Sequence, residues 1–168
     1  LTDLIIPDGV TRIGAYAFYK CTALTSITIP DSVTSIGSDA FYGCSNITAV
    51  TAPFSPWSLS SMFDYNVPAS ITTVTATGTK ITGSAFYNCK SLTSVTIGSA
   101  VESIGNSAFV GCRNIPAITL PESVTTIDSS AFSNCSGLIA VFYTGTESSS
   151  KDISIGAYNN ELKNAEWH

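Results

Sequence analysis

The chain has 168 residues, a length typical of one ordinary domain. Only 11% of the residues are charged but 44% are hydrophobic, so the chain can build a core and wholesale disorder is excluded. The seven Lys and Arg residues are scattered and the net charge is −5, which argues against nucleic acid and anionic membrane surfaces as partners. No apolar run approaches the roughly 20 residues of a membrane span, so we expect no direct membrane insertion.

A repeat runs along the chain. The pair Ala-Phe occurs five times, and a cysteine follows each Phe by three residues. Successive Phe positions differ by 23, 45, 23 and 23 residues, and the cysteines repeat these spacings. The 45-residue interval holds two units of altered length, over about residues 47–91. Such a fixed period is the signature of a stacked repeat protein.

Each unit begins with a short apolar segment. In the unit 24–46, Leu24, Ile27 and Ile29 follow a period of two and are stopped by Pro30, which predicts a β-strand. A second apolar pair, Val33 and Ile36, predicts another short strand after a bend. The same frame recurs from Leu1 to Leu138, and a glycine such as Gly37 permits the turn that follows.

The Ala-Phe-x-x-Cys segment ends each unit. Ser38 and Ser107 precede two of these segments and suit helix N-caps, so we expect a short helical turn that places Phe and Cys on one face. No unit can bury its apolar edge alone. Stacking the units buries Leu on Leu, Phe on Phe and Cys on Cys, which predicts a solenoid.

The pattern I-P-x-x-V-x-x-I-G-x-x-A-F-x-x-C resembles the BspA-like (Treponema-type) leucine-rich repeats, over roughly residues 1–142. The resemblance implies an α/β repeat: a right-handed curved solenoid with short parallel strands and short helical turns. It also implies a bacterial, or sometimes protozoan, surface or secreted protein that binds host proteins or other cells. The family shares no catalytic residues that could be carried over, and it implies no cofactor.

We expect a solenoid over residues 1–142 and a C-terminal closing segment over 143–168, which resembles the end of such arrays. Residues 53–70 lack the second strand pattern and the cysteine, so we expect a bulge or kink there. Leu1 already begins a strand pattern. The chain is therefore expected to be part of a longer protein, without an N-terminal cap in this segment.

The first candidate site is the outward side of the first strand of each unit, because alternate residues of a strand point away from the core. Stacking predicts a neutral, hydroxyl-rich column that is apolar at both ends. The alternative is that threonine simply suits an exposed strand. The column begins at Ile5 and contains Thr28, Thr51, Thr75, Thr96, Thr119 and Phe142.

The second candidate site is the aromatic cluster of the irregular unit. Exposed rings at Phe54, Trp57 and Tyr65 would suit contact with a protein or a glycan. The alternative, which we favour for most of the cluster, is that these rings refill core space left by the missing pattern.

The remaining candidates carry little chemistry. We expect the cysteines to form a ladder of buried free thiols, because parallel side chains in one column are poorly oriented for disulfides. No metal-ligand spacing is present, and the recurring Asp8 and Asp31 are better explained as turn residues than as a catalytic pair. We therefore expect neither an enzyme, nor a cofactor, nor a metal site.

Together these observations favour a non-enzymatic recognition or adhesion module at a bacterial surface or outside the cell. The expected partner is a host or bacterial surface protein, including extracellular-matrix proteins, with a glycan less favoured. The alternatives are a structural spacer and a segment that assembles weakly end to end through Leu1, Leu4 and Ile6.

Overall fold

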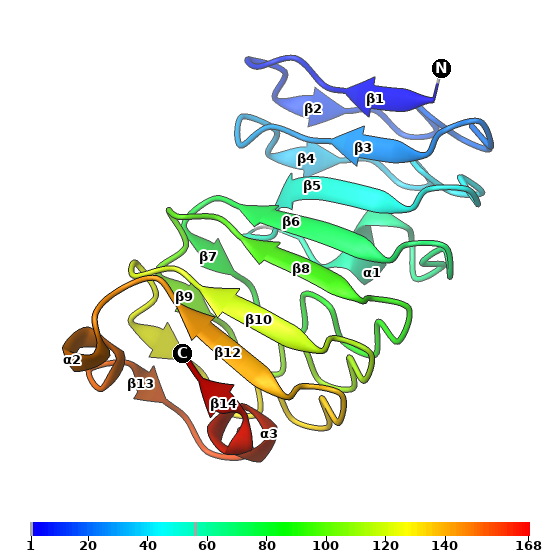
Figure 1. Ribbon diagram of the computed structural model, residues 1–168. Helices are drawn as coiled ribbons and strands as arrows, with labels where there is room; N and C mark the ends of the chain where they lie inside the picture. Colours follow the sequence, from blue (N-terminus) through cyan, green and yellow to red (C-terminus); the bar gives the residue numbers. More distant parts are fainter. Residues whose placement is uncertain (1, 56) are drawn as a thin grey trace.

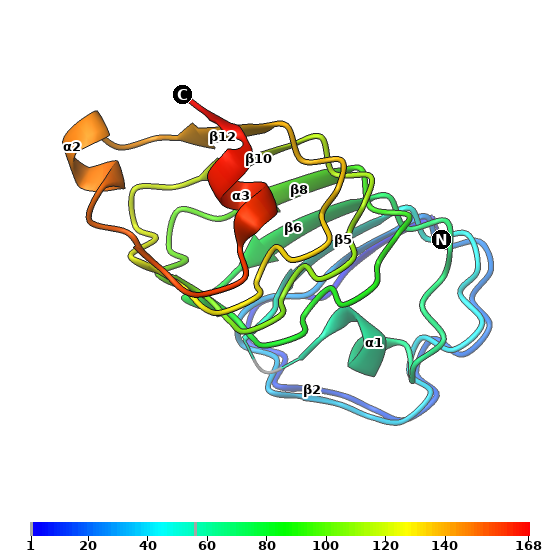
Figure 2. The same cartoon turned by 90° about the horizontal axis from the view of Figure 1, so that it is seen from below.

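The computed structural model describes residues 2–55 and 57–168; Pro56 and Leu1, the first residue of the predicted strand pattern, lie outside the described residues. The chain forms a parallel-strand solenoid of about seven turns, with few and short helices (Figure 1). The predicted leucine-rich repeat solenoid is therefore confirmed. Figure 2 shows that β5 (Ala49–Pro53), β8 (Ser94–Ile97) and β12 (Ala140–Tyr143) lie on one side of the solenoid and β2 (Arg12–Ile13) on the opposite side.

The strands stack in two lines. The first strand line consists of β1 (Asp3–Ile5), β3 (Ser26–Thr28), β5 (Ala49–Pro53), β6 (Thr73–Thr77), β8 (Ser94–Ile97), β10 (Ala117–Leu120), β12 (Ala140–Tyr143) and β14 (Glu166–Trp167). The second strand line consists of β2 (Arg12–Ile13), β4 (Ser35–Ile36), β7 (Lys80–Ile81), β9 (Ser103–Ile104), β11 (Thr126–Ile127) and β13 (Ser154–Ile155). The three helices are α1 (Leu59–Met62), α2 (Glu147–Ser150) and α3 (Asn160–Asn164).

The first strand line pairs in parallel but is divided between β8 and β10. In regular turns the residue before the strand donates its N–H to the preceding turn, as from Thr93 to the Thr72 carbonyl (2.9 Å). Pro116 occupies the equivalent position before β10 and has no N–H to donate. Pro121 likewise lacks the N–H that the equivalent Gly98 donates to the Ala76 carbonyl (2.8 Å), so prolines remove a donor at both ends of β10.

The second strand line is divided between β4 and β7, where the irregular unit lacks a bend. Strand β5 ends at Pro53, and no bend separates it from the next residue, Phe54. The Phe54 carbonyl accepts the Thr82 N–H at 2.7 Å. In the regular turn before it, the Ile13 carbonyl accepts from Gly37 in the same way (2.9 Å). Phe54 thus takes the place of a second-strand residue without the strand, at the point where the sequence predicted a bulge or kink.

The Ala-Phe-x-x-Cys segments form consecutive turns instead of the expected short helices. Asp39 and Ser107, which precede two of the Ala-Phe pairs, have φ angles of 55° and 58°. A left-handed residue cannot continue a right-handed helix, so Ser38 and Ser107 are not helix N-caps. Alternate N–H groups bond across to the next turn of the solenoid, as from Phe109 to the Ala131 carbonyl (2.7 Å). The N–H groups between them donate within their own turn, as from Val110 to the Ser107 carbonyl (3.2 Å).

A column of phenylalanine rings fills the core behind these turns. Phe86 and Phe109 stack with their centroids 4.9 Å apart, and Phe109 and Phe132 stack at 5.0 Å. The irregular unit has no Ala-Phe pair, yet it extends both halves of the column. The ring centroids of Phe63 and Phe41 are 6.0 Å apart, and those of Phe54 and Phe86 are 4.4 Å apart. The core therefore continues through the unit whose sequence pattern is lost.

All five cysteines are free thiols, and all except the half-buried Cys21 are buried. Three of them donate to the carbonyl of a phenylalanine in the preceding turn, each at 3.0 Å: Cys44 to Phe18, Cys112 to Phe86 and Cys135 to Phe109. Burial raises the pKa of Cys44 and Cys112, and raises the pKa of Cys89 and of Cys135 to about 12. The predicted ladder of buried free thiols is confirmed.

The segment 143–168 adds β13 to the second strand line and β14 to the first. In the regular turns, backbone N–H groups donate to carbonyls of the next turn. In this segment, side-chain oxygens accept such hydrogen bonds instead. The Phe132 N–H donates to Asn159 Oδ1 and the Asn134 N–H donates to Glu161 Oε1, both at 2.9 Å. Asn159 is fully buried, and its Nδ2 donates to the carbonyls of Asp128 and Gly156. These contacts satisfy backbone groups that the turn before would otherwise expose.

We expect Asn159→Leu to lower the free energy of unfolding by about 2–4 kcal/mol, because it leaves the buried Phe132 N–H and Asp128 carbonyl without partners. Urea unfolding followed by far-UV circular dichroism measures the change. Asn160→Leu, at the exposed next residue where α3 begins, is the matched control. Equal stability of the two variants would contradict the role of Asn159.

We also expect stability to fall as the pH rises above 9. The ordinary thiol pKa in the unfolded chain is 9.0, whereas burial raises the pKa of Cys89 and Cys135 to about 12 in the folded protein. Between these values the unfolded chain loses protons that the folded protein keeps, so unfolding becomes more favourable. Urea unfolding from pH 7 to 11 measures the slope. A Cys89→Ala/Cys135→Ala variant should show a shallower fall, and an unchanged slope would contradict the assignment.

Candidate functional site

The outward residues of the first strand line form the predicted column. Strand register places Ile5 beside Thr28, then Thr51, Thr75 and Thr96 in turn, and separately places Thr119 beside Phe142. Thr28, Thr51 and Thr75 are half-buried, whereas Thr96 and Thr119 are exposed. The division between β8 and β10 falls between these two parts. We call this surface the sheet face.

Both ends of the sheet face carry apolar side chains. Ile5 is 72% exposed at one end. At the other end, Phe142 is 44% exposed and stacks on the His168 imidazole, with their ring centroids 5.1 Å apart. Exposed apolar groups at both ends of a hydroxyl-lined surface are suitable anchors for a protein partner.

The sheet face is hollowed at the carboxyl ends of its first strands. A depression of about 720 Å³ is lined by Ile5, Thr28 and Thr51 from the column and by Asp8 and Asp31 from the bends. Thr77 Oγ1 donates to Asp31 Oδ1 at 2.8 Å. This hydrogen bond links the turns on either side of the irregular unit, which has no bend of its own. Among the described residues, neither carboxylate takes part in an ion pair. The depression therefore combines hydroxyls, apolar surface and negative charge.

The aromatic cluster of the irregular unit divides between core and surface. Phe54 is fully buried, so its prediction as a ligand contact is wrong; the core space left by the missing Ala-Phe pair takes its ring. Met62 and Phe63 are buried as well, which confirms the alternative of a refilled core. Trp57 is half-buried against the core, and Tyr65 is 88% exposed.

The sequence predictions missed a second group of exposed aromatic residues. Tyr19, Tyr42 and Tyr87 directly follow an Ala-Phe pair and are 40%, 37% and 49% exposed. Tyr19 and Tyr42 stack with centroids 5.5 Å apart, and the Lys20 ammonium lies 5.2 Å from the Tyr19 ring centroid. The signal was present as Ala-Phe-Tyr in three of the five repeats. We call this surface, formed by the Ala-Phe-x-x-Cys turns, the turn edge.

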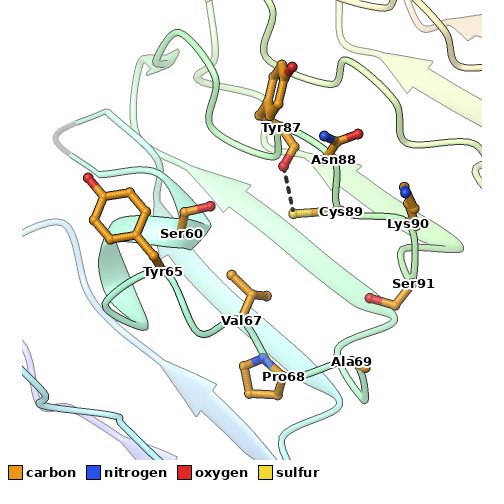
Figure 3. Close-up of a pocket in the computed structure, with 10 residues that line it drawn as sticks. All are labelled: Ser60, Tyr65, Val67, Pro68, Ala69, Tyr87, Asn88, Cys89, Lys90 and Ser91. Atoms are coloured by element: carbon orange, nitrogen blue, oxygen red, sulfur yellow. Dashed lines mark hydrogen bonds between the residues drawn. The ribbon is translucent and has the colours of Figure 1, made fainter.

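The turn edge contains a pocket of about 340 Å³ between the irregular unit and the turn that follows it (Figure 3). Tyr65 borders it on the side of the irregular unit and Tyr87 on the side of the turn that follows. We call it the tyrosine pocket; its other lining residues are Ser60, Val67, Pro68, Ala69, Asn88, Cys89, Lys90 and Ser91.

Within the described part of the chain, no group of three or more His, Cys, Asp or Glu residues has metal-binding geometry. Over the same residues, no helix is long and apolar enough to cross a membrane. Leu4 and Ile6 are each only 8% exposed, so they offer little side-chain surface for end-to-end association, and Leu1 lies outside the described residues.

Solved structures are similar to this chain. A leucine-rich repeat protein from Bacteroides ovatus is 23% identical, with 84% of this chain and 42% of that chain covered and a TM-score of 0.56. The pneumococcal vaccine antigen PcpA is 24% identical, with 84% of this chain and 40% of that chain covered and a TM-score of 0.54. The Treponema pallidum leucine-rich repeat protein is 27% identical, with 83% of this chain and 57% of that chain covered and a TM-score of 0.44. This chain thus spans about half the length of these proteins, or less.

No curated protein matches the chain. The model of the BspA type leucine-rich repeat region does match, in six copies over residues 1–66 and 58–165. These ranges include the irregular unit and most of the segment 143–168. The chain therefore belongs to the BspA type leucine-rich repeat family.

Proposed function

We propose that this chain is a non-catalytic recognition module of a bacterial cell-surface or secreted protein, and that it binds a host or bacterial surface protein across the sheet face. Extracellular-matrix proteins are the first class of partner to test. The proposal rests above all on the hydroxyl column, which strand register holds in line from Ile5 to Thr96 and from Thr119 to Phe142.

Rigidity supports this function. The column residues belong to strands whose backbone groups are bonded to neighbouring turns, so little conformational entropy is lost when a partner binds. Threonine hydroxyls both donate and accept hydrogen bonds, and the depression beside Thr28 and Thr51 provides shape. Since few charges are present, shape and hydrogen bonding would carry specificity.

The location is supported by family membership and by one fold relative. The pneumococcal protein PcpA, which shares the fold, is described as a vaccine antigen. A surface or secreted location would make the sheet face accessible to proteins outside the cell.

The test is a binding screen of the purified chain against immobilised extracellular-matrix proteins. We expect saturable binding that Thr51→Arg/Thr75→Arg weakens by about tenfold or more, because two long cationic side chains in the middle of the column block close approach. Circular dichroism and the urea midpoint verify that this variant is folded.

Thr11→Arg/Thr79→Arg is the matched control, since it adds the same charge at exposed positions next to the second strand line. It should bind like the unmodified protein. Binding that survives Thr51→Arg/Thr75→Arg would move the interface away from the sheet face, and a lack of saturable binding across the panel would favour a structural spacer.

A further inference from the structure

We propose that the tyrosine pocket binds a single hexopyranose ring, such as the terminal sugar of a glycan. The pocket lies on the turn edge, whereas the proposed protein interface lies on the sheet face. The proposal is thus independent of the proposed function and involves different residues.

The pocket exists because the irregular unit lacks an Ala-Phe-x-x-Cys turn. In the first two turns the tyrosines cover one another, as the stacked rings of Tyr19 and Tyr42 show. Tyr65 and Tyr87 flank the opening instead, with 88% and 49% of their surfaces exposed (Figure 3). Two exposed rings beside an open pocket leave aromatic surface available for a ligand.

The lining matches the two kinds of surface on a sugar ring. Val67, Pro68 and Cys89 supply apolar surface, and burial keeps the Cys89 thiol neutral by raising its pKa to about 12. The faces of a pyranose carry C–H groups that pack on such surface and on aromatic rings. Its edge carries hydroxyls, which need hydrogen-bonding partners.

Those partners are present on the pocket walls. Ser60, Asn88, Lys90 and Ser91 line the pocket, and their side chains carry donors and acceptors. A volume of about 340 Å³ lies at the small end of the range for ligand pockets, ~300–1,000 Å³, and suits one ring. A phenylalanine or proline side chain of a protein would fill the apolar part but would form no hydrogen bonds with the polar groups of the lining. The lining therefore favours a sugar.

Cys89 shows how the missing turn shapes the pocket. Three other buried thiols donate to a phenylalanine carbonyl of the preceding turn at 3.0 Å. The irregular unit places no such carbonyl beside Cys89, whose Sγ lies 3.9 Å from the Tyr87 carbonyl of its own turn. The thiol thus lines the pocket because the preceding turn does not cover it.

The experiment is a ¹H–¹⁵N NMR titration of the chain with methyl pyranosides of glucose, galactose, mannose and N-acetylglucosamine. We expect at least one of them to shift the amide resonances of Asn88, Lys90 and Ser91 saturably, with a millimolar dissociation constant. Tyr65→Ala and Tyr87→Ala should each weaken this binding by about tenfold. Both residues are exposed, and the NMR spectrum of each variant reports whether it is folded.

Tyr158→Ala is the matched control, because Tyr158 is 72% exposed and does not line the pocket. It should bind the sugar unchanged, and so should Thr51→Arg/Thr75→Arg, which tests the sheet face. The proposal fails if no pyranoside shifts these amides saturably, or if Tyr65→Ala and Tyr87→Ala bind as well as the control. It also fails if N-acetyltyrosinamide saturates the pocket and no pyranoside does, which would assign it to a protein side chain.

Discussion

In-register stacking of successive turns is the constraint on which this molecule depends. A single 23-residue unit has one apolar edge and no second layer to cover it, so each turn is stable only against its neighbours. The fixed spacing places Phe109 between Phe86 and Phe132, and places the Cys112 thiol at the Phe86 carbonyl. The same spacing aligns the outward threonines, so the core and the candidate binding surface follow from one periodicity.

The irregular unit separates what stacking requires from what it tolerates. The core must continue, and Phe54 and Phe63 extend its two halves although the unit has no Ala-Phe pair. The bend and the turn are dispensable. Without the bend, the second strand line is divided between β4 and β7; without the turn, the edge opens as the tyrosine pocket. An interruption of the repeat thus creates surface features that regular turns lack.

The two candidate surfaces therefore differ in origin and in chemistry. The sheet face arises from repetition; it is extended, rich in hydroxyls and anchored by Ile5 and Phe142, as suits a large protein partner. The tyrosine pocket arises from an interruption; it is small and lined by aromatic and polar groups, as suits a single ring. A protein on the sheet face and a sugar in the tyrosine pocket would not compete for space, because the strands form the first surface and the turn edge forms the second.

The sequence alone determined the solenoid, the first strand of each unit and the buried cysteine ladder, because periodic apolar residues leave few ways to bury their edge. Tertiary structure decided the rest. The turns before each cysteine are not helical, since residues such as Ser107 are left-handed and bond to the next turn. Gly105 is required because a Cβ there would lie 2.6 Å from the Gly83 nitrogen, a contact between turns that local patterns cannot reveal. Likewise, only packing decided that Phe54 is buried and Tyr65 is exposed. Both residues belong to one aromatic cluster in the sequence, and the tertiary structure placed the Phe54 ring in the core space left by the missing Ala-Phe pair.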